Sequence, residues 1–227
     1  DIISIFPGMF ESPFGDSIIE RACGKGLLDI RVHDLRDYTL NKHRKVDDTP
    51  FGGGVGMVMN VEPIARALEA IKKDVPKANT ILLSPGGSPF DQEKASELSF
   101  QENLILICGR YEGVDERIRL HFVDEEISIG DYILTGGEIP AMVLVEAVSR
   151  LIPGILGDSE SIVEESFSDG MLEYPQYTRP RDYKGFKVPD VLVSGDPKKI
   201  RAWQKTEALK KTESVRPDLF EKNKRSN

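Results

Sequence analysis

The stretch EISIGDYILTGGEIP (126–140) joins a short apolar run to a glycine-bearing turn and then to the start of a long apolar segment. The same order occurs twice upstream, where TILLS (80–84) and LILIC (104–108) each lead into a glycine-bearing turn. Two further runs of this kind, IISIF (2–6) and IRVHDL (30–35), come earlier in the chain. Short apolar, β-branched runs bounded by turn residues are typical of buried strands. We therefore expect five strands.

Amphipathic segments of helical length separate these strands. They are residues 9–23, VEPIARALEAIKKDV (61–75), DQEKASELS (91–99), DERIRLHF (115–122) and EIPAMVLVEAVSRLI (138–152). Strands that alternate with helices predict parallel pairing and a layered α/β fold. The segment 138–152 is apolar on most sides, so we expect it in the core or at a subunit interface.

The glycine-bearing turns SPGGSP (84–89), CGRYEG (108–113) and IGDYILTGGEIP (129–140) each follow a predicted strand. In an open α/β sheet, ligands bind outside the carboxyl ends of the strands, so three such turns indicate one shared pocket. A single turn would indicate only that Gly and Pro make tight bends. None of the turns matches the dinucleotide fingerprint or the Walker pattern, so neither NAD nor ATP is predicted.

The composition, 39% hydrophobic and 30% charged, is ordinary for a soluble globular protein. No apolar run is long enough for a membrane span. The first residues, DIISIFPGMF, lack the features of a signal peptide and are expected to form a buried strand. Cys23 and Cys108 lie far apart within apolar segments, which favours two reduced thiols in a cytoplasmic protein over a disulfide.

The charge is distributed unevenly although the whole chain carries −8. Residues 179–227 hold 14 Lys and Arg against 7 Asp and Glu, a net +7, whereas residues 1–178 hold 16 against 31, a net −15. Such asymmetry indicates either nucleic-acid contact by the basic part or a solvated helical surface. Charge alone does not decide between them.

The pattern divides the chain into three parts: residues 1–156 as the α/β domain, 157–178 as a linker, and 179–227 as a small basic helical domain. Residues 154–178 show little periodicity, and long loops of this kind are uncommon unless functional. In the last part, DPKKIRAWQKTEALKKTES (196–214) predicts a helix with Asp196 as N-cap and Pro197 in its first turn. A shorter helix is expected over 216–223.

Three long motifs carry a resemblance to a known family. GRYEGVDERI (109–118), SIGDYILTGGEIPAMVLVEAVSRLIPGILG (128–157) and LEYPQYTRP (172–180) resemble the bacterial tRNA (guanine-N1) methyltransferases, and ISIFPGMF (3–10) and HRKVDDTPFGGGVGM (43–57) extend the match over nearly the whole chain. The resemblance implies a parallel-sheet α/β fold with a deep trefoil knot on its C-terminal side and a small all-helical C-terminal domain. It also implies S-adenosylmethionine as methyl donor, the guanosine at position 37 of tRNA as target, and a homodimer paired through the knot.

The resemblance places the donor at the glycine-bearing turns. The residues at matching positions are Ser84, Pro85, Gly109, Tyr111, Glu112, Gly113, Ile129, Gly130, Asp131, Tyr132, Ile133, Leu134, Gly136, Gly137 and Pro140. Glycines allow backbone groups to approach a ligand closely, and apolar side chains suit an adenine face. Glu112 either orients the sulfonium end electrostatically or stabilises its turn.

The reaction needs a base for the N1 proton of guanine and a cation for the charge that develops towards O6. The resemblance places the base at Glu165 and the cation at Arg150, whereas the residues taken alone would indicate solvated surface and a helix-end ion pair. The family generally has aspartate at the position of Glu165, so the stem here is one methylene longer. Glu164 and Asp169 are the reserve candidates for the base.

His43, Arg44, Asp47 and the Gly52–Gly54 loop form a second candidate surface for substrate, to which we add Asp169. The histidine and arginine could bind phosphate, and Asp47 could accept from a guanine edge. Histidine and cysteine are too few and too scattered for a zinc site. His33 and His121 are expected to be structural. Only the resemblance suggests Mg²⁺, and no ligand cluster is evident.

Two other functions fit part of the pattern. A knotted methyltransferase acting on a ribose 2′-hydroxyl would share the α/β domain but would not need the acidic linker and basic tail. A non-catalytic RNA-binding protein would be expected to be basic overall and to expose aromatic platforms. This chain is acidic, and its glycines are concentrated in three strand-end turns.

Overall fold

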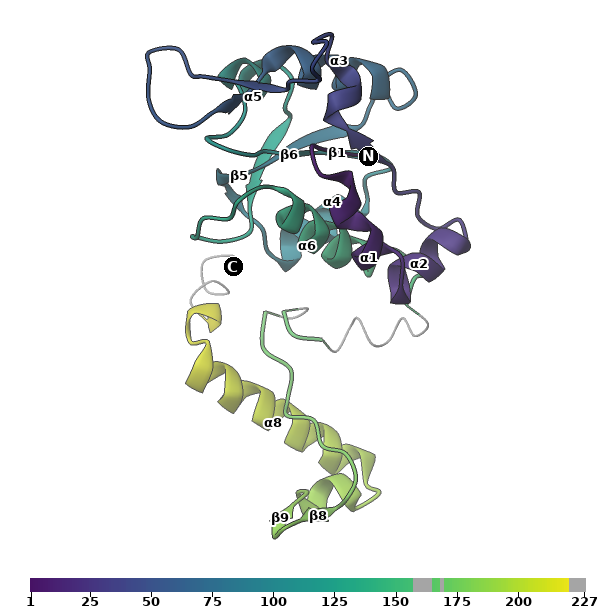
Figure 1. Cartoon of the computed structure of the whole chain (residues 1–227). Coiled ribbons are helices and arrows are strands. Elements are labelled where there is room, and N and C mark those ends of the chain that lie inside the picture. The colour runs from purple at the N-terminus through teal and green to yellow at the C-terminus, as the bar shows by residue number, and fades with distance from the viewer. Residues whose placement is uncertain (157–164, 168–169, 221–227) are drawn as a thin grey trace. The chain divides into compact units, whose positions relative to one another are not determined.

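The structure is a computed structural model that describes residues 1–156, 165–167 and 170–220. The chain divides into two compact units, Asp1–Gly157 and Asp158–Asn227, which are described separately below. Figure 1 shows the first unit in purple to green and the second in green to yellow.

The first unit contains a five-stranded sheet in the order β2-β1-β6-β5-β7. Its strands are β1 (Ile2–Ser4), β2 (Val32–Asp34), β5 (Asn79–Pro89), β6 (Leu104–Cys108) and β7 (Glu125–Ser128). All neighbouring pairs in this sheet are parallel. The five predicted strands and the layered α/β fold are therefore confirmed.

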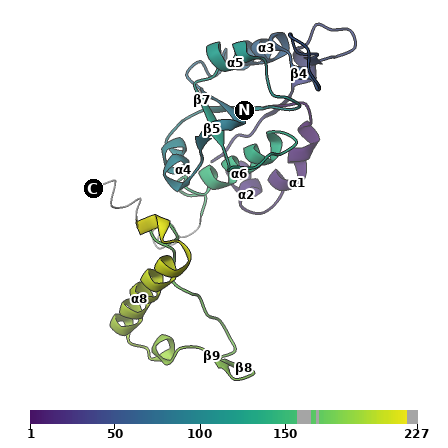
Figure 2. The same cartoon turned by 90° about the vertical axis from the view of Figure 1, so that its left-hand side faces the viewer.

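Each face of the sheet has its own apolar core. Side chains alternate between the faces along a strand, so Ile105 and Ile107 point into one core while Leu106 and Cys108 point into the other. The first core is closed by η2 (Leu35–Tyr38), α3 (Val61–Ile71) and α5 (Glu116–His121), and the second by η1 (Pro7–Phe10), α4 (Gln92–Ser99) and α6 (Glu138–Ser149). Figures 1 and 2 both show α3 and α5 on one side of the sheet and α4 and α6 on the other.

Two local predictions need correction. The single helix expected over 9–23 is divided into η1, α1 (Glu11–Phe14) and α2 (Ser17–Gly24). Gly15 ends α1, and the Asp16 side chain accepts a hydrogen bond from the Ser17 N–H at the start of α2. A glycine followed by an N-cap residue therefore interrupts the helical pattern.

The second correction concerns SPGGSP (84–89), which lies within the long strand β5 and is not a turn after it. Both Leu83 and Ser88 pair with Ile127 of β7, so the residues between them form a bulge in the ladder. A Cβ atom at Gly87 would collide with the Ile127 backbone, which explains a glycine at that point. The bulge directs Ser84 and Pro85 to the edge of the sheet where β6 and β7 end.

The second unit is built around α8 (Pro197–Val215). The Asp196 side chain accepts from the N–H groups of Lys198 and Lys199, which confirms the predicted N-cap. The predicted all-helical segment also contains an antiparallel hairpin, β8 (Asp182–Tyr183) and β9 (Phe186–Lys187), followed by η3 (Asp190–Val193). The shorter helix expected over 216–223 falls partly outside the described residues, as does the predicted linker 157–178.

Candidate active site

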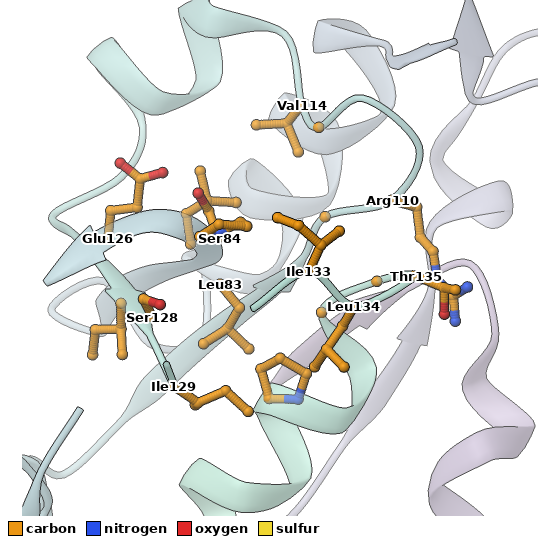
Figure 3. A pocket seen from close by; sticks show the side chains of 18 of the residues that line it. Leu83, Ser84, Arg110, Val114, Glu126, Ser128, Ile129, Ile133, Leu134 and Thr135 are labelled. Atoms are coloured by element: carbon orange, nitrogen blue, oxygen red, sulfur yellow. The ribbon is translucent and has the colours of Figure 1, made fainter. Parts of the chain in front are cut away.

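A cavity of about 380 Å³ lies at the edge of the sheet where β6 and β7 end, beside the first turn of α6. Its walls come from the β5 bulge, the turn after β6 and the turn after β7 (Figure 3). The predicted donor-binding residues that line it are Ser84, Pro85, Gly109, Tyr111, Glu112, Gly113, Ile129, Gly130, Tyr132, Ile133, Leu134, Gly136, Gly137 and Pro140. Asp131 is the one predicted member that does not line the cavity. The fold therefore brings the three glycine-bearing segments to one site.

Backbone hydrogen bonds join two of these segments. The Gly137 N–H donates to the Gly109 carbonyl over 2.8 Å, and Arg110 forms an antiparallel bridge with Gly136. The chain after β6 and the chain before α6 consequently run side by side. This pairing gives the cavity a fixed backbone wall, which suits recognition of a ligand through main-chain groups.

Two glycines at the wall have different reasons to be glycine. A Cβ atom at Gly137 would lie 2.7 Å from the Cα of Cys108, so close packing of the backbones requires glycine there. A Cβ atom at Gly109 would meet only the Leu83 carbonyl oxygen at 3.6 Å and a Val114 methyl at 3.9 Å, which are ordinary contacts. The protein itself therefore has room for a side chain at 109. The space that Gly109 leaves open is cavity, available to a ligand.

A buried ion pair supports the turn after β6. Glu138, in the first turn of α6, is fully buried, and its two oxygens accept from the Ser4 hydroxyl at 2.7 Å and from Arg110 Nε at 2.8 Å. The Arg110 guanidinium also lies 4.6 Å from the centroid of the Phe6 ring. A buried carboxylate is stable only when it is paired and hydrogen-bonded, and both conditions are met. Arg110 also lines the cavity, where Figure 3 shows its side chain beside Thr135, and its bond to Glu138 holds the turn in place.

The sequence did not predict this pair as a unit. Arg110 and Glu138 are 28 positions apart, and neither was assigned to the site. The available signal was a single acidic residue at the start of a helix that is otherwise apolar on most sides.

Carboxylates are concentrated around the cavity. Glu112, Glu116 and Glu126 line it together with Arg119, whose Nε donates to Glu116 at 2.9 Å. Figure 3 places Glu126 beside Ser84, on the side of the cavity away from Arg110. Glu126 was not predicted. The three carboxylates outnumber the two arginines that line the cavity, Arg110 and Arg119, and this favours a ligand that carries positive charge.

The predicted substrate residue Asp47 is linked to the cavity by Tyr111. Asp47 begins the short strand β3 (Asp47–Asp48), which pairs with β4 (Val58–Met59). Its side-chain hydrogen bond with Tyr111, followed by burial, raises the pKa of Tyr111. Tyr111 also has a φ of 60°, a strained conformation for a non-glycine residue. Tyr111 thus connects the β3–β4 pair to the turn after β6.

Two further predicted substrate residues, His43 and Arg44, are at the surface. His43 and Arg44 are both exposed, and the His43 N–H donates to Asn41 at 2.8 Å. The Arg44 guanidinium is paired with Asp37 and lies 3.4 Å from Asp34. Two carboxylates already share its charge, so a phosphate at this point would compete with them.

Comparison with known proteins identifies the family of the chain. The family model described as "tRNA (Guanine-1)-methyltransferase TrmD" matches residues 1–222. The chain is 60% identical over 222 residues to the "tRNA (guanine-N(1)-)-methyltransferase" of Dictyoglomus turgidum, with 98% of this chain and 89% of the relative covered. The protein of the same name from Carboxydothermus hydrogenoformans is 56% identical, with 97% and 86% covered. The chain belongs to the tRNA (guanine-1)-methyltransferase family.

The two residues predicted to carry the chemistry of this family lie in different units. Arg150 caps the C-terminus of α6, where its N–H donates to the Glu146 carbonyl. Glu165 is half-buried in the second unit, next to a short turn in which the Ser166 hydroxyl accepts from the Glu173 N–H at 3.0 Å. The reserve candidates Glu164 and Asp169 lie outside the described residues.

The segment next to Glu165 is anchored to α8. The Leu172 N–H donates to the Thr212 hydroxyl at 3.0 Å, and Thr212, which is fully buried, donates in turn to the Ala208 carbonyl at 2.8 Å. The Arg216 guanidinium lies 5.9 Å from the centroid of the Phe167 ring. The segment that follows Glu165 is therefore held against the C-terminal part of α8, an arrangement that the sequence did not predict.

Three further features bear on the sequence predictions for this member of the tRNA (guanine-1)-methyltransferase family. Within residues 1–156, 165–167 and 170–220, no cluster of three or more His, Cys, Asp or Glu side chains is arranged to hold a metal ion. No helix in those ranges has both the length and the apolar character needed to cross a membrane. Cys23 and Cys108 are both free thiols, and burial raises the pKa of each.

Proposed function

We propose that this protein transfers a methyl group from S-adenosylmethionine to N1 of the guanosine at position 37 of tRNA. The observation that carries the proposal is the coincidence of two findings. A family match spans residues 1–222, and one cavity collects the turns that the family's motifs supply. The two other functions considered, ribose methylation and non-catalytic RNA binding, are not favoured by relatives that are all named tRNA (guanine-N(1)-)-methyltransferases.

The cavity residues fit S-adenosylmethionine, whose sulfonium supplies an electrophilic methyl group. The open space at Gly109 and the apolar Leu83, Ile133, Leu134 and Pro140 suit the adenosine part. Glu112, Glu116 and Glu126 suit the cationic end. The trefoil knot that the resemblance implies for this region stays a prediction, as does a requirement for Mg²⁺.

Glu165 and Arg150 take the two chemical roles. The Glu165 carboxylate accepts the proton that leaves N1 as the N1–methyl bond forms, so the guanine stays neutral. Arg150 stabilises negative charge that develops towards O6 during proton removal. His43, Arg44, Asp47 and Asp169 are proposed to orient the nucleotide, and the basic segment 179–227 to bind the tRNA backbone.

A second copy of the chain is proposed to complete the site. The single chain leaves Ile139 and Val143 of α6 exposed at 47% and 42%. Exposed apolar side chains on a helix of this composition suit a protein interface. The resemblance implies that two copies pair in this region and share each active site. The cytoplasm, where tRNA is modified, is the proposed compartment.

The test is methylation of a tRNA transcript by the purified chain, followed by identification of the modified nucleoside. We expect 1-methylguanosine at position 37, and its absence from a transcript in which that guanosine is replaced. A 2′-O-methylated nucleoside, or no methylation by a chain that binds tRNA, would contradict the proposal. Light scattering at micromolar concentration tests the dimer, and a monomeric mass would contradict that part alone.

A further inference from the structure

The hairpin of the second unit presents two aromatic rings to solvent. Tyr183 and Phe186 are opposite each other across β8 and β9, and their exposed fractions are 58% and 79%. They lie within residues 176–187, a stretch in which every residue is exposed. Figures 1 and 2 show the hairpin at the tip of the second unit, away from the C-terminal end of α8. Apolar rings in this position need a reason other than core packing.

The turn of the hairpin is built to hold this arrangement. Lys184 and Gly185 have φ angles of 56° and 91°, the left-handed pair typical of a tight two-residue hairpin turn. The Asp182 carboxylate accepts from the Gly185 N–H at 2.8 Å, and the Val188 N–H donates to the Arg181 carbonyl at 2.9 Å. A short hairpin without a core is only marginally stable, so these local bonds fix its shape. The tight turn therefore places Tyr183 and Phe186 directly opposite each other.

The charges around the rings are mainly positive. Lys184 and Lys187 are exposed, and the Lys184 ammonium lies 5.4 Å from the centroid of the Tyr183 ring. The nearby carboxylates are already engaged, because Asp190 binds Arg181 at 2.8 Å and Asp182 binds the turn. We call Tyr183, Lys184 and Phe186 the hairpin face; Lys187 is opposite Asp182, on the other side of the hairpin. Aromatic rings beside a cation are a combination that binds single-stranded nucleic acid.

We propose that the hairpin face is a stacking surface for an unpaired base of the RNA substrate, with Lys184 on the adjoining phosphate. This inference rests on the proposed function and assigns a named element to substrate binding. A base has an apolar face that covers a ring, and the phosphate that follows it meets Lys184. An apolar protein partner would leave the Lys184 ammonium group without a counterion, so the charge favours RNA.

The experiment measures the tRNA affinity of the full chain over a range of salt concentrations. Y183A and F186A should each weaken binding roughly five- to hundredfold and leave the salt dependence unchanged, because stacking releases no counterions. K184A should instead lower the slope of log Kd against log salt by about 0.7–0.9. F186W should keep wild-type affinity. F100A removes a ring that is 85% exposed in the first unit and should change nothing.

Several outcomes would overturn the inference. One is unchanged tRNA affinity in both Y183A and F186A. Another is a smaller mass of these variants in light scattering, which would make a second copy of the chain the occupant of the hairpin face. The wild-type methylation assay separates this inference from the proposed function. A wild-type chain that produces no 1-methylguanosine, together with weakened binding by Y183A and F186A, would refute the function and support the hairpin face.

Discussion

The two units of this protein differ in their buried apolar core and in the kind of ligand that each suits. The first has apolar cores on both faces of a parallel sheet and a cavity whose wall is backbone. In the described part of the second unit, the buried apolar residues are Ala208 and Leu219, and segment 179–227 carries a net charge of +7. A small ligand is recognised by fixed geometry, which needs a rigid core. An extended polyanion is held by many exposed charges, which do not.

E165Q is the strongest test of this comparison. It asks whether the second unit supplies the general base while the first unit binds the methyl donor. Without a carboxylate to accept the N1 proton, single-turnover methyl transfer should fall by about 10²–10⁴. The donor affinity measured by calorimetry should stay the same. E165D should remain active. A fully active E165Q enzyme would move the base to Asp169 or Glu164.

Removal of the buried carboxylate of Glu138 in the first unit should lower the free energy of unfolding more than removal of any surface ion pair in the second unit. E138A leaves Arg110 without its partner, and breaking a buried pair costs about 3–5 kcal/mol of unfolding free energy. The matched change E207A removes a half-buried carboxylate from its ion pair with the exposed Lys210, which lies 2.8 Å away, and should cost under about 1 kcal/mol. Denaturant unfolding measures both. Equal effects would show that Glu138 is not the support described above.

A side chain at position 109 should lower the affinity of the cavity for its ligand and leave the fold intact. G109V places methyl groups in open cavity, so S-adenosylmethionine affinity should fall by about 1–3 kcal/mol, the usual cost of overpacking. Because the protein has room for a Cβ there, the melting temperature should change little. G137V is the contrast, since its side chain would meet the Cys108 backbone and should destabilise the fold. Unchanged affinity in G109V would mean that the donor binds elsewhere.

The smallest expected effect concerns the charge on a helix cap in the first unit. Asp115 caps α5, and its hydrogen bond with the Arg117 side chain lowers the pKa of the carboxyl. Asparagine caps as well as aspartate but carries no charge, so D115N should cost under about 1 kcal/mol at pH 7. The pKa of the Asp115 carboxyl is lower in the folded state than its unfolded value of about 3.9, so its charge adds stability at pH values above about 3.9. This stability is lost as the pH falls through the folded-state pKa. The melting temperatures should therefore converge in acid, and a constant difference would exclude a charge effect.

Much of the local structure could be predicted because it depends on local chemistry. Runs such as LILIC (104–108) become buried strands since they are apolar and β-branched, and Asp196 caps α8 since its side chain reaches the first N–H groups. The sequence also determined that three glycine-bearing segments would meet, because parallel strands end at one edge. Its long motifs determined the family.

Tertiary structure decided what depends on residues far apart in the chain. SPGGSP (84–89) is a bulge in β5 because β7 pairs with both ends of it, which no property of those six residues requires. Arg110 binds Glu138 and lies against Phe6 because the fold brings these residues together, although they are far apart in the sequence. A buried charge takes the partner that the fold brings to it, and the sequence does not state which residue that is.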